Sequence, residues 1–394
     1  MFDVLEGIPF EDILKADNNW EEFKKRFKHK LTDDIIHEVE KVLKCRTTEN
    51  GFITYICPNC GHLQHIPFSC KSKLCSRCGK RYTDIWSDKL LKRLLNTDHR
   101  HIVLTISDKL WRFFINRPVL QKVLFLAANK TLLDVFSYHA KQKIMPGIMM
   151  IIHPFGDDLK PNFHVHILIT CGGLTRDNSK WIHLPFMSYD VIRAKWQYYL
   201  LTSLKELLPK RIIQPITDWC FKYRNNGFVI FANSIIKYAN KGLLRYIARY
   251  TRHPAISKKR ILSYNGKSVT FSYEAYDKVH TKTMDKFDFI YAVIQHMAPK
   301  NFKTIRYFGL YARRSHTRYS ISKSLLPETK SYPLQSFNYR DNITKFTGKD
   351  PLLCEHCKTE MVIYQITYID KHGTIKTVGG DHWVYHEPAC LDTG

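Results

Sequence analysis

The feature that most constrains the fold is a pair of apolar runs joined by a short polar segment, IMMIIHPFGDDLKPNFHVHILIT, residues 148–170. Both runs contain β-branched residues, which favour strands. Residues 154–163 between them hold two prolines, a glycine and two aspartates, which favour turns. We therefore expect two neighbouring antiparallel strands, around which the rest of the chain has to pack.

Three histidines lie in these two expected strands. Because side chains alternate along a strand, His164 and His166 point to one face, whereas Val165 and Ile167 point to the other. If the strands pair with His153 opposite His164, three imidazoles converge on one face. Three nitrogen ligands with open positions beyond them suit a catalytic divalent ion. The alternative is a structural role, in which hydrogen bonds satisfy the polar rings of an apolar strand.

The wider pattern of the chain predicts an α+β fold, with helices packed on an antiparallel sheet. Apolar stripes at helical spacing predict one or two helices within residues 17–44, and a strand is expected over residues 101–107. Further helices are expected over residues 82–95, 117–141, 188–208, 242–252 and 287–297. Residues 256–276 predict a hairpin with Asn265-Gly266 as a type I′ turn. His99-Arg100-His101 surrounds an arginine with two histidines, and we expect it at a solvated strand entrance.

The charge balance points to a polyanionic partner. The chain has 61 Lys plus Arg against 36 Asp plus Glu, a formal net charge of +25, and its pI is about 9.5. A surplus of this size favours nucleic acid as the partner. The acidic N-terminus lacks the apolar region of a signal peptide, and no apolar run approaches the length of a membrane span. We therefore expect a cytoplasmic, nucleoid-associated protein without a membrane partner.

Cysteine spacing predicts structural zinc. The chain has eleven cysteines and no expected secretory signal, which favours metal ligation over disulfides. Two Cys-x2-Cys pairs separated by fourteen residues supply four thiolates for one tetrahedral ion: Cys57, Cys60, Cys75 and Cys78. Cys70, His62 and His65 lie in the same loop and are alternative ligands. Cys354 and Cys357 form a further Cys-x2-Cys pair, which could hold a second zinc ion with His382, His386 and Cys390 downstream.

A pair of tyrosines is the candidate nucleophile. Residues 242–252, GLLRYIARYTR, predict a short basic helix with Tyr246 and Tyr250 on one face. A tyrosine hydroxyl can attack a DNA phosphate and hold the strand as a phosphotyrosine ester while the sugar 3′-oxygen leaves. Two tyrosines on one face permit two covalent links at once. The candidate DNA-binding residues around them are Arg245, Arg249, Arg252, Lys258 and Lys259.

Chance remains an alternative, because the chain has 22 tyrosines and three Tyr-x3-Tyr pairs. The pair at 307 and 311 has Gly309 inside it, which disfavours a helix. The pair at 364 and 368 lies in a β-like run. The pattern therefore favours Tyr246 and Tyr250, which could otherwise be packing residues.

Four stretches resemble a known family. HPFGDDLKPNFHVHILITCGG resembles the metal motif of two-tyrosine rolling-circle insertion-sequence transposases of the HUH superfamily, and YIARYTRHPAIS resembles their paired-tyrosine motif. CPNCGHLQHIPFSCKSKLCSRC resembles their N-terminal zinc-binding region, and HMAPKNFKTIRYFGLYA resembles a downstream block. The order and spacing match over roughly residues 20–320. The sequence departs from the usual pattern at Pro154, where the family has threonine after the first histidine.

The resemblance implies single-strand cleavage and strand transfer in a bacterial cell, without a triad of carboxylates. It implies that His164 and His166 are metal ligands and that Tyr246 and Tyr250 are nucleophiles. His153 stands where related relaxases carry a third histidine, and Asp157 and Asp158 are rival third ligands. The expected cofactors are Mg²⁺ or Mn²⁺ at the histidines and structural Zn²⁺ at the cysteines. The expected partner is single-stranded DNA at the element ends and the target.

We therefore predict a transposase that nicks and rejoins single-stranded DNA through 5′-phosphotyrosine intermediates. The expected organisation is an N-terminal helical region (1–44), a cysteine-rich zinc-binding domain with a helix (45–96), an HUH catalytic domain (97–325) and a C-terminal region (326–394). A plasmid replication initiator or relaxase with the same chemistry is one alternative. A non-catalytic zinc-containing DNA-binding regulator is the other, and it would leave the inward histidines and the arginine-flanked tyrosines without a purpose.

Overall fold

The computed structural model describes residues 7–76, 78–79, 86, 90, 93–232, 235–237, 255–275, 278–298, 301–327, 340–341, 344, 350–370 and 372–380. The helices are α1 (Phe10–Lys15), α2 (Asn19–Arg26), α3 (Asp33–Leu43), α5 (Asp108–Phe114), α6 (Pro118–His139), α7 (Tyr189–Leu207), α8 (Lys210–Tyr223), α10 (Lys286–Ile294) and α11 (His316–Leu325). The strands are β1 (Phe52–Ile56), β2 (Leu63–Pro67), β3 (His99–Thr105), β4 (Ile144–Met145), β5 (Gly147–Phe155), β6 (Pro161–Thr170), β7 (Gly172–Thr175), β8 (Trp181–His183), β9 (Ile230–Ala232), β10 (Ile261–Tyr264), β11 (Ser268–Ala275), β12 (Lys278–Asp285), β13 (Ile305–Gly309), β14 (Val362–Ile369) and β15 (Ile375–Gly379).

A five-stranded sheet in the order β13-β5-β6-β3-β9 forms the centre of the fold, and every neighbouring pair is antiparallel. The predicted strand pair is confirmed as β5 and β6, the second and third strands of this sheet. Their register places His153 directly opposite His164, the pairing that brings the three imidazoles to one face. The register shifts between His153 and Phe155, at Pro154. A proline has no N–H to donate to the ladder, so an irregularity at this position is expected.

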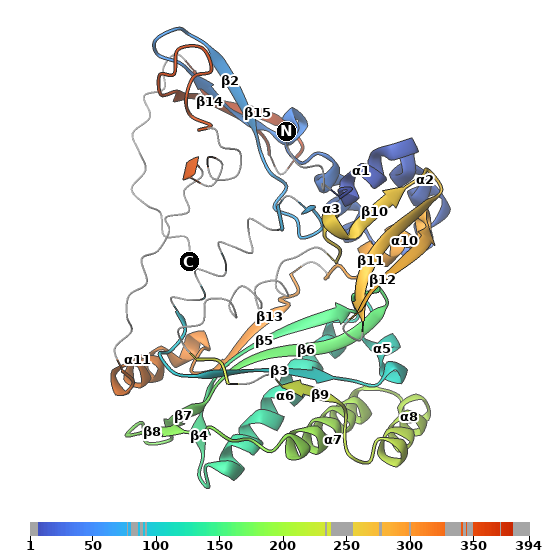
Figure 1. Ribbon diagram of the computed structural model, residues 1–394, viewed down its shortest axis with the longest axis vertical. Helices are drawn as coiled ribbons and strands as arrows, with labels where there is room; N and C mark the ends of the chain where they lie inside the picture. The colour runs from blue at the N-terminus through green and yellow to red at the C-terminus, as the bar shows by residue number, and fades with distance from the viewer. Residues whose placement is uncertain are drawn as a thin grey trace.

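Helices cover one face of this sheet (Figure 1). Val165, Ile167 and Ile169 of β6 pack into the same apolar cluster as residues of α5, α6 and α7. Pro118 begins α6, a position where its missing N–H costs nothing. The histidines of β6 lie on the opposite face, because successive side chains of a strand alternate. The predicted α+β class, with helices on an antiparallel sheet, is confirmed.

The N-terminal helices pack against a second, smaller sheet. Helices α1, α2 and α3 share an apolar cluster with β10, β11 and α10, and Figure 1 shows these elements side by side. Trp20 and Phe23 of α2 are buried there, which confirms the expected packing face of residues 17–44. The expected hairpin is also present as β10 and β11. Its turn differs from the prediction, since only Gly266 has a positive φ, whereas a type I′ turn needs two such residues.

A third sheet joins segments from the two ends of the described chain. Its order is β15-β14-β1-β2, and Phe52 of β1 pairs with Thr367 of β14. Figure 1 shows β2, β14 and β15 together at one end of the molecule, away from the five-stranded sheet. This sheet therefore packs residues 52–67 of the expected zinc-binding domain against residues 362–379 of the expected C-terminal region. Within the described residues, no helix combines the length and apolar character that a membrane crossing requires.

Candidate functional site: three histidines beside a zinc-binding region

The histidine site lies on the face of the central sheet that α6 and α7 leave uncovered. His153 of β5 and His164 and His166 of β6 bring one ring nitrogen each within 4.8 Å of one another. Further along the same face, Met149 and Leu168 belong to an apolar cluster. Strand alternation and register are sufficient to assemble this group.

The rings of His164 and His166 are oriented so that their Nε2 atoms face each other. His164 Nδ1 lies 2.7 Å from the carbonyl oxygen of Asn162. That oxygen can only accept, so Nδ1 carries the proton and Nε2 of the neutral ring keeps its lone pair. His164 Nε2 lies 3.0 Å from His166 Nε2. Two nitrogens that bind one ion at about 2.1 Å each lie no more than about 4 Å apart, so this spacing fits a shared divalent ion.

His101 of β3 is a site residue that the sequence did not reveal. Its Nε2 lies 3.0 Å from His166 Nδ1, and the two rings stack with an interplanar angle of 4°. The expectation of a solvated entrance for His99 and His101 is wrong, since they are 3% and 2% exposed. A ligating histidine usually donates its second N–H to a neighbour that fixes the ring, and His101 occupies that place beside His166.

Burial keeps the site histidines neutral. It lowers the pKa of His153 and His166 well below the ordinary value, and it lowers the pKa of His164 as well. Burial also lowers the pKa of His101 to about 4. A neutral imidazole is the form that binds a divalent ion, so the site is in its ligating form at neutral pH.

We expect His101→Phe to weaken divalent-ion binding without destroying the site. The substitution keeps an aromatic ring of similar size and removes the nitrogen beside His166. Loss of such an outer partner typically costs about 10–100-fold in metal affinity. A Mn²⁺ titration of the DNA cleavage that the sequence motifs imply should therefore show a shifted midpoint and near-normal activity at saturation.

The matched control is His99→Phe. His99 lies on the same strand and the same face, and it is similarly buried, but its Nε2 hydrogen-bonds the hydroxyl of Tyr311 at 2.7 Å. The control should keep the wild-type Mn²⁺ midpoint. An equal shift in both variants would show that His101 acts only through packing.

His153, and neither rival aspartate, completes the histidine group. Among the described residues the group contains His153, His164 and His166, with no carboxylate. Asp157 forms an ion pair with Arg260, and Asp158 pairs with Lys160 in the same turn.

A cavity of about 400 Å³ adjoins the site. His153 and Phe155 form part of its wall, together with Lys73 and His296. Lys73 comes from the cysteine-rich region, and its Nζ hydrogen-bonds Thr304 Oγ1 at 2.9 Å, just before β13. The cysteine-rich region therefore borders the histidine face, and a ligand that reaches the histidines through this cavity also meets Lys73.

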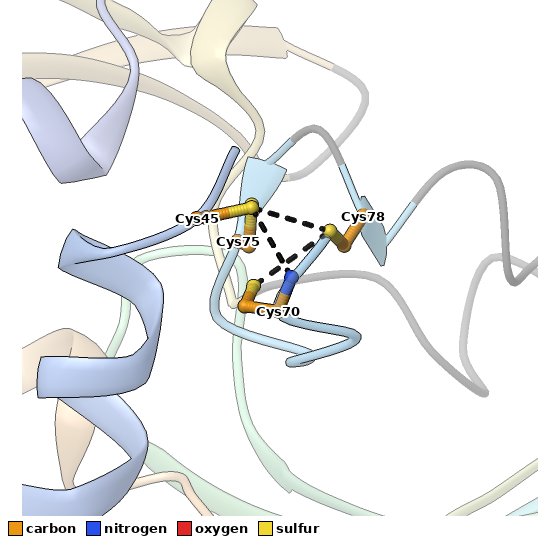
Figure 2. Close-up of side chains that lie close together, drawn as sticks. All are labelled: Cys45, Cys70, Cys75 and Cys78. Carbon is orange, nitrogen blue, oxygen red and sulfur yellow. Dashed lines mark hydrogen bonds between the residues drawn. The ribbon is translucent and has the colours of Figure 1, made fainter. Parts of the chain in front are cut away.

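Four cysteines form a compact cluster next to the N-terminal helices (Figure 2). Cys45 Sγ lies 3.6 Å from Cys78 Sγ and 3.7 Å from Cys75 Sγ, and Cys70 Sγ lies 3.7 Å from Cys78 Sγ. Zinc–sulfur bonds of about 2.3 Å place tetrahedral thiolates about 3.8 Å apart, so these distances fit one zinc ion. This arrangement differs from the predicted set, because Cys57 and Cys60 are absent from it and Cys45 takes part.

Cys70, the predicted alternative, does join this cluster, whereas His62 and His65 do not. Cys45 was missed because it has no Cys-x2-Cys partner and follows α3, far from the others in sequence. Cys57 and Cys60 lie instead with Cys354 and Cys357. The two Cys-x2-Cys pairs predicted to share an ion therefore belong to different clusters, and the C-terminal pair has N-terminal partners.

The predicted tyrosines lie outside the described residues, as do Arg245, Arg249 and Arg252. Lys258 and Lys259 form a short 3-10 turn before β10. The two rival tyrosine pairs are in strands or beside them: Tyr307 lies in β13, and both Tyr364 and Tyr368 lie in β14. Gly309 ends β13 with a positive φ of 56°, so residues 307–311 do not form a helix.

Comparison with known proteins identifies the family. A family model described as a putative transposase matches residues 147–318, and one described as a transposase zinc-binding domain matches residues 15–106. The transposase of insertion sequence element IS801 from Pseudomonas savastanoi pv. phaseolicola is 30% identical over 376 residues, which cover 90% of this chain and 88% of that protein. The chain belongs to the IS91 family of insertion-sequence transposases.

A second relative supports this transposase assignment. The putative transposase y4qJ of Sinorhizobium fredii is 24% identical over 372 residues, 89% of this chain and 90% of the relative. No solved structure matches the chain. The resemblance noted in the sequence motifs is thereby confirmed, and DNA is the partner of this transposase. The zinc-binding match contains all four cysteines of the cluster in Figure 2.

Proposed function

We propose that this transposase cuts single-stranded DNA at the ends of its element and rejoins it to a target through 5′-phosphotyrosine intermediates. Tyr246 and Tyr250 are the nucleophiles, and His153, His164 and His166 hold Mg²⁺ or Mn²⁺. The observation that carries the proposal is the pair of Nε2 atoms of His164 and His166, 3.0 Å apart with His153 beside them. The resemblance of residues 246–257 to the paired-tyrosine motif supports the nucleophiles.

The histidines and the tyrosines have different roles in the proposed reaction. When bound at the histidines, the divalent ion neutralises charge that develops on the phosphate and the leaving oxygen. A tyrosine Oη attacks phosphorus and loses its proton, and the bond from phosphorus to the 3′-oxygen breaks. The 3′-oxygen takes up a proton, so the upstream fragment ends in a free 3′-hydroxyl, and the downstream fragment is held by its 5′-phosphate on the tyrosine. Attack by a second 3′-hydroxyl reverses these bonds and joins a new strand.

The rest of the site offers places for the DNA backbone. Lys73 lines the cavity beside His153, and Lys258 and Lys259 lie in the segment that follows the paired-tyrosine motif. Basic side chains bind phosphates of any sequence and position the strand. These groups would hold the phosphate chain, together with Arg245, Arg249 and Arg252.

A cleavage assay separates this function from its alternatives. We expect the transposase to nick an oligonucleotide with an element-end sequence as a single strand and to leave the same sequence intact as a duplex. The readout is a denaturing gel of end-labelled DNA with Mg²⁺ present. A regulator would bind either form without cutting. A plasmid initiator or relaxase would cut its own origin sequence and ignore the element end.

A further inference from the structure

We propose that Cys57, Cys60, Cys354 and Cys357 bind a second zinc ion, which fastens the C-terminal segment to the N-terminal zinc-binding region. The two family matches end at residues 106 and 318, so the second half of this site lies outside both. The site is composite, because its two halves lie about 300 residues apart in the chain.

The sulfur atoms have the spacing of ligands around one ion. Cys57 Sγ lies 3.3 Å from Cys357 Sγ, Cys60 Sγ lies 3.5 Å from Cys354 Sγ, and Cys357 Sγ lies 3.6 Å from Cys60 Sγ. A tetrahedral zinc site with bonds of about 2.3 Å places its sulfurs about 3.8 Å apart. A disulfide would need about 2.05 Å, and all four cysteines are free thiols. The distances therefore fit thiolates around a metal.

The two halves have the same backbone fold. Cys57 N–H donates to the carbonyl of the residue five positions later, and Gly61 N–H donates back to the Cys57 carbonyl. Cys354 N–H likewise donates to the carbonyl five positions later, and Lys358 N–H donates back to the Cys354 carbonyl. Gly61 and Lys358 also share a positive φ, 71° and 60°.

A positive φ is unfavourable for a residue with a Cβ, so Lys358 needs a reason to adopt it. The turn that it completes directs the thiols of Cys354 and Cys357 to the same side as those of the first turn. Two matched turns that present four thiols to one point constitute a built metal site.

Within the described residues, the sheet around these turns has a small apolar core. Among the described residues, the apolar cluster at these turns has four buried members, Tyr55, Cys57, Cys354 and Met361, and two of them are the proposed ligands. Every residue of β15 is exposed. Small units with so little buried surface usually need a metal or a disulfide for stability. The ion therefore adds stability that the four-stranded sheet does not obtain from the packing of its described residues.

The test is the number of zinc ions bound by the full chain, measured by native mass spectrometry after removal of loosely bound metal. Wild type should carry two. Cys57→Ser/Cys60→Ser and Cys354→Ser/Cys357→Ser should each carry one, and the quadruple variant should also carry one because both pairs serve the same ion. Retention of both zinc ions in Cys354→Ser/Cys357→Ser would overturn the proposal, as would complete loss of zinc in the quadruple variant.

Matched cysteines outside the clusters provide controls. Cys171→Ser/Cys220→Ser removes two buried thiols that belong to neither group. This variant should keep two zinc ions. His382, His386 and Cys390, the further ligands suggested by the sequence, lie outside the described residues.

A measurement on the wild-type protein tests the proposal even if the cysteine variants fail to fold. Under gradual chelation, iodoacetamide should label Cys57, Cys60, Cys354 and Cys357 with one common time course, read by peptide mass spectrometry. Labelling of Cys57 and Cys60 in step with Cys75 and Cys78, and apart from Cys354 and Cys357, would contradict the composite site.

Discussion

The double variant His164→Ala/His166→Ala is expected to lose single-strand cleavage by roughly 10³-fold or more while it still folds and binds DNA. Removal of even one group that stabilises charge in a transition state typically costs about 10²–10³-fold, and this variant removes two ligands of the proposed ion. Both side chains lie on a sheet face away from the helix-covered core that holds Val165 and Ile167. Cleavage rates on a labelled oligonucleotide and thermal unfolding would be measured together.

The wild-type enzyme should also respond to chelation. Mild EDTA should stop cleavage, and added Mg²⁺ or Mn²⁺ should restore it, because an open imidazole site exchanges its ion more readily than a cage of thiolates. His37→Ala is the matched control for the double histidine variant, since His37 lines the same cavity but is absent from the histidine group. It should cleave at the wild-type rate. Full cleavage by metal-free protein would show that the histidines have a structural role, as would full cleavage by the double variant.

The histidine site was predictable because its information is local. Alternation along residues 148–170 fixed the faces of His164 and His166, and the turn-forming segment required the two strands to pair. His101 could not be found in this way. Its place beside His166 depends on the β3–β6 register, in which Val103 pairs with His166, and no short sequence pattern encodes that register.

The zinc ligands show the same limit more clearly. A Cys-x2-Cys spacing indicates that two thiols of one turn belong to one cluster, and the structure places 57 with 60, 75 with 78, and 354 with 357 in this way. The spacing does not indicate which turns come together. That choice depends on the pairing of β1 with β14, whose partners lie at opposite ends of the described chain. Sequence proximity favoured the wrong pairing.

The second large effect is expected at the tyrosines. Tyr246→Phe/Tyr250→Phe should fold and bind DNA but form no covalent adduct, because phenylalanine keeps the ring and lacks the attacking oxygen. Each single variant should retain some nicking if either hydroxyl can reach the phosphate, yet lose complete strand transfer. If both residues were only packed in a core, the loss of a hydrogen bond would cost about 0.5–1.5 kcal/mol of stability and leave activity intact.

The control pair has the same spacing in a different setting. Tyr364 and Tyr368 lie in β14 of the composite sheet, so Tyr364→Phe/Tyr368→Phe should form the adduct at the wild-type level. Tyr311→Phe is a second control, since the Tyr311 hydroxyl hydrogen-bonds His99 and the backbone N–H of Leu95. That variant should lose some stability without loss of the adduct.

The central claim is tested most directly by trapping the protein–DNA adduct. An oligonucleotide with an element end, labelled at its 3′ end, is incubated with the transposase and Mg²⁺, and the reaction is denatured with detergent. We expect labelled DNA that migrates with the protein, with peptides linked through Tyr246 or Tyr250, and no such species from Tyr246→Phe/Tyr250→Phe. An adduct that persists in that double variant, or one that maps to Tyr307 or Tyr311, would show that these tyrosines are not the nucleophiles.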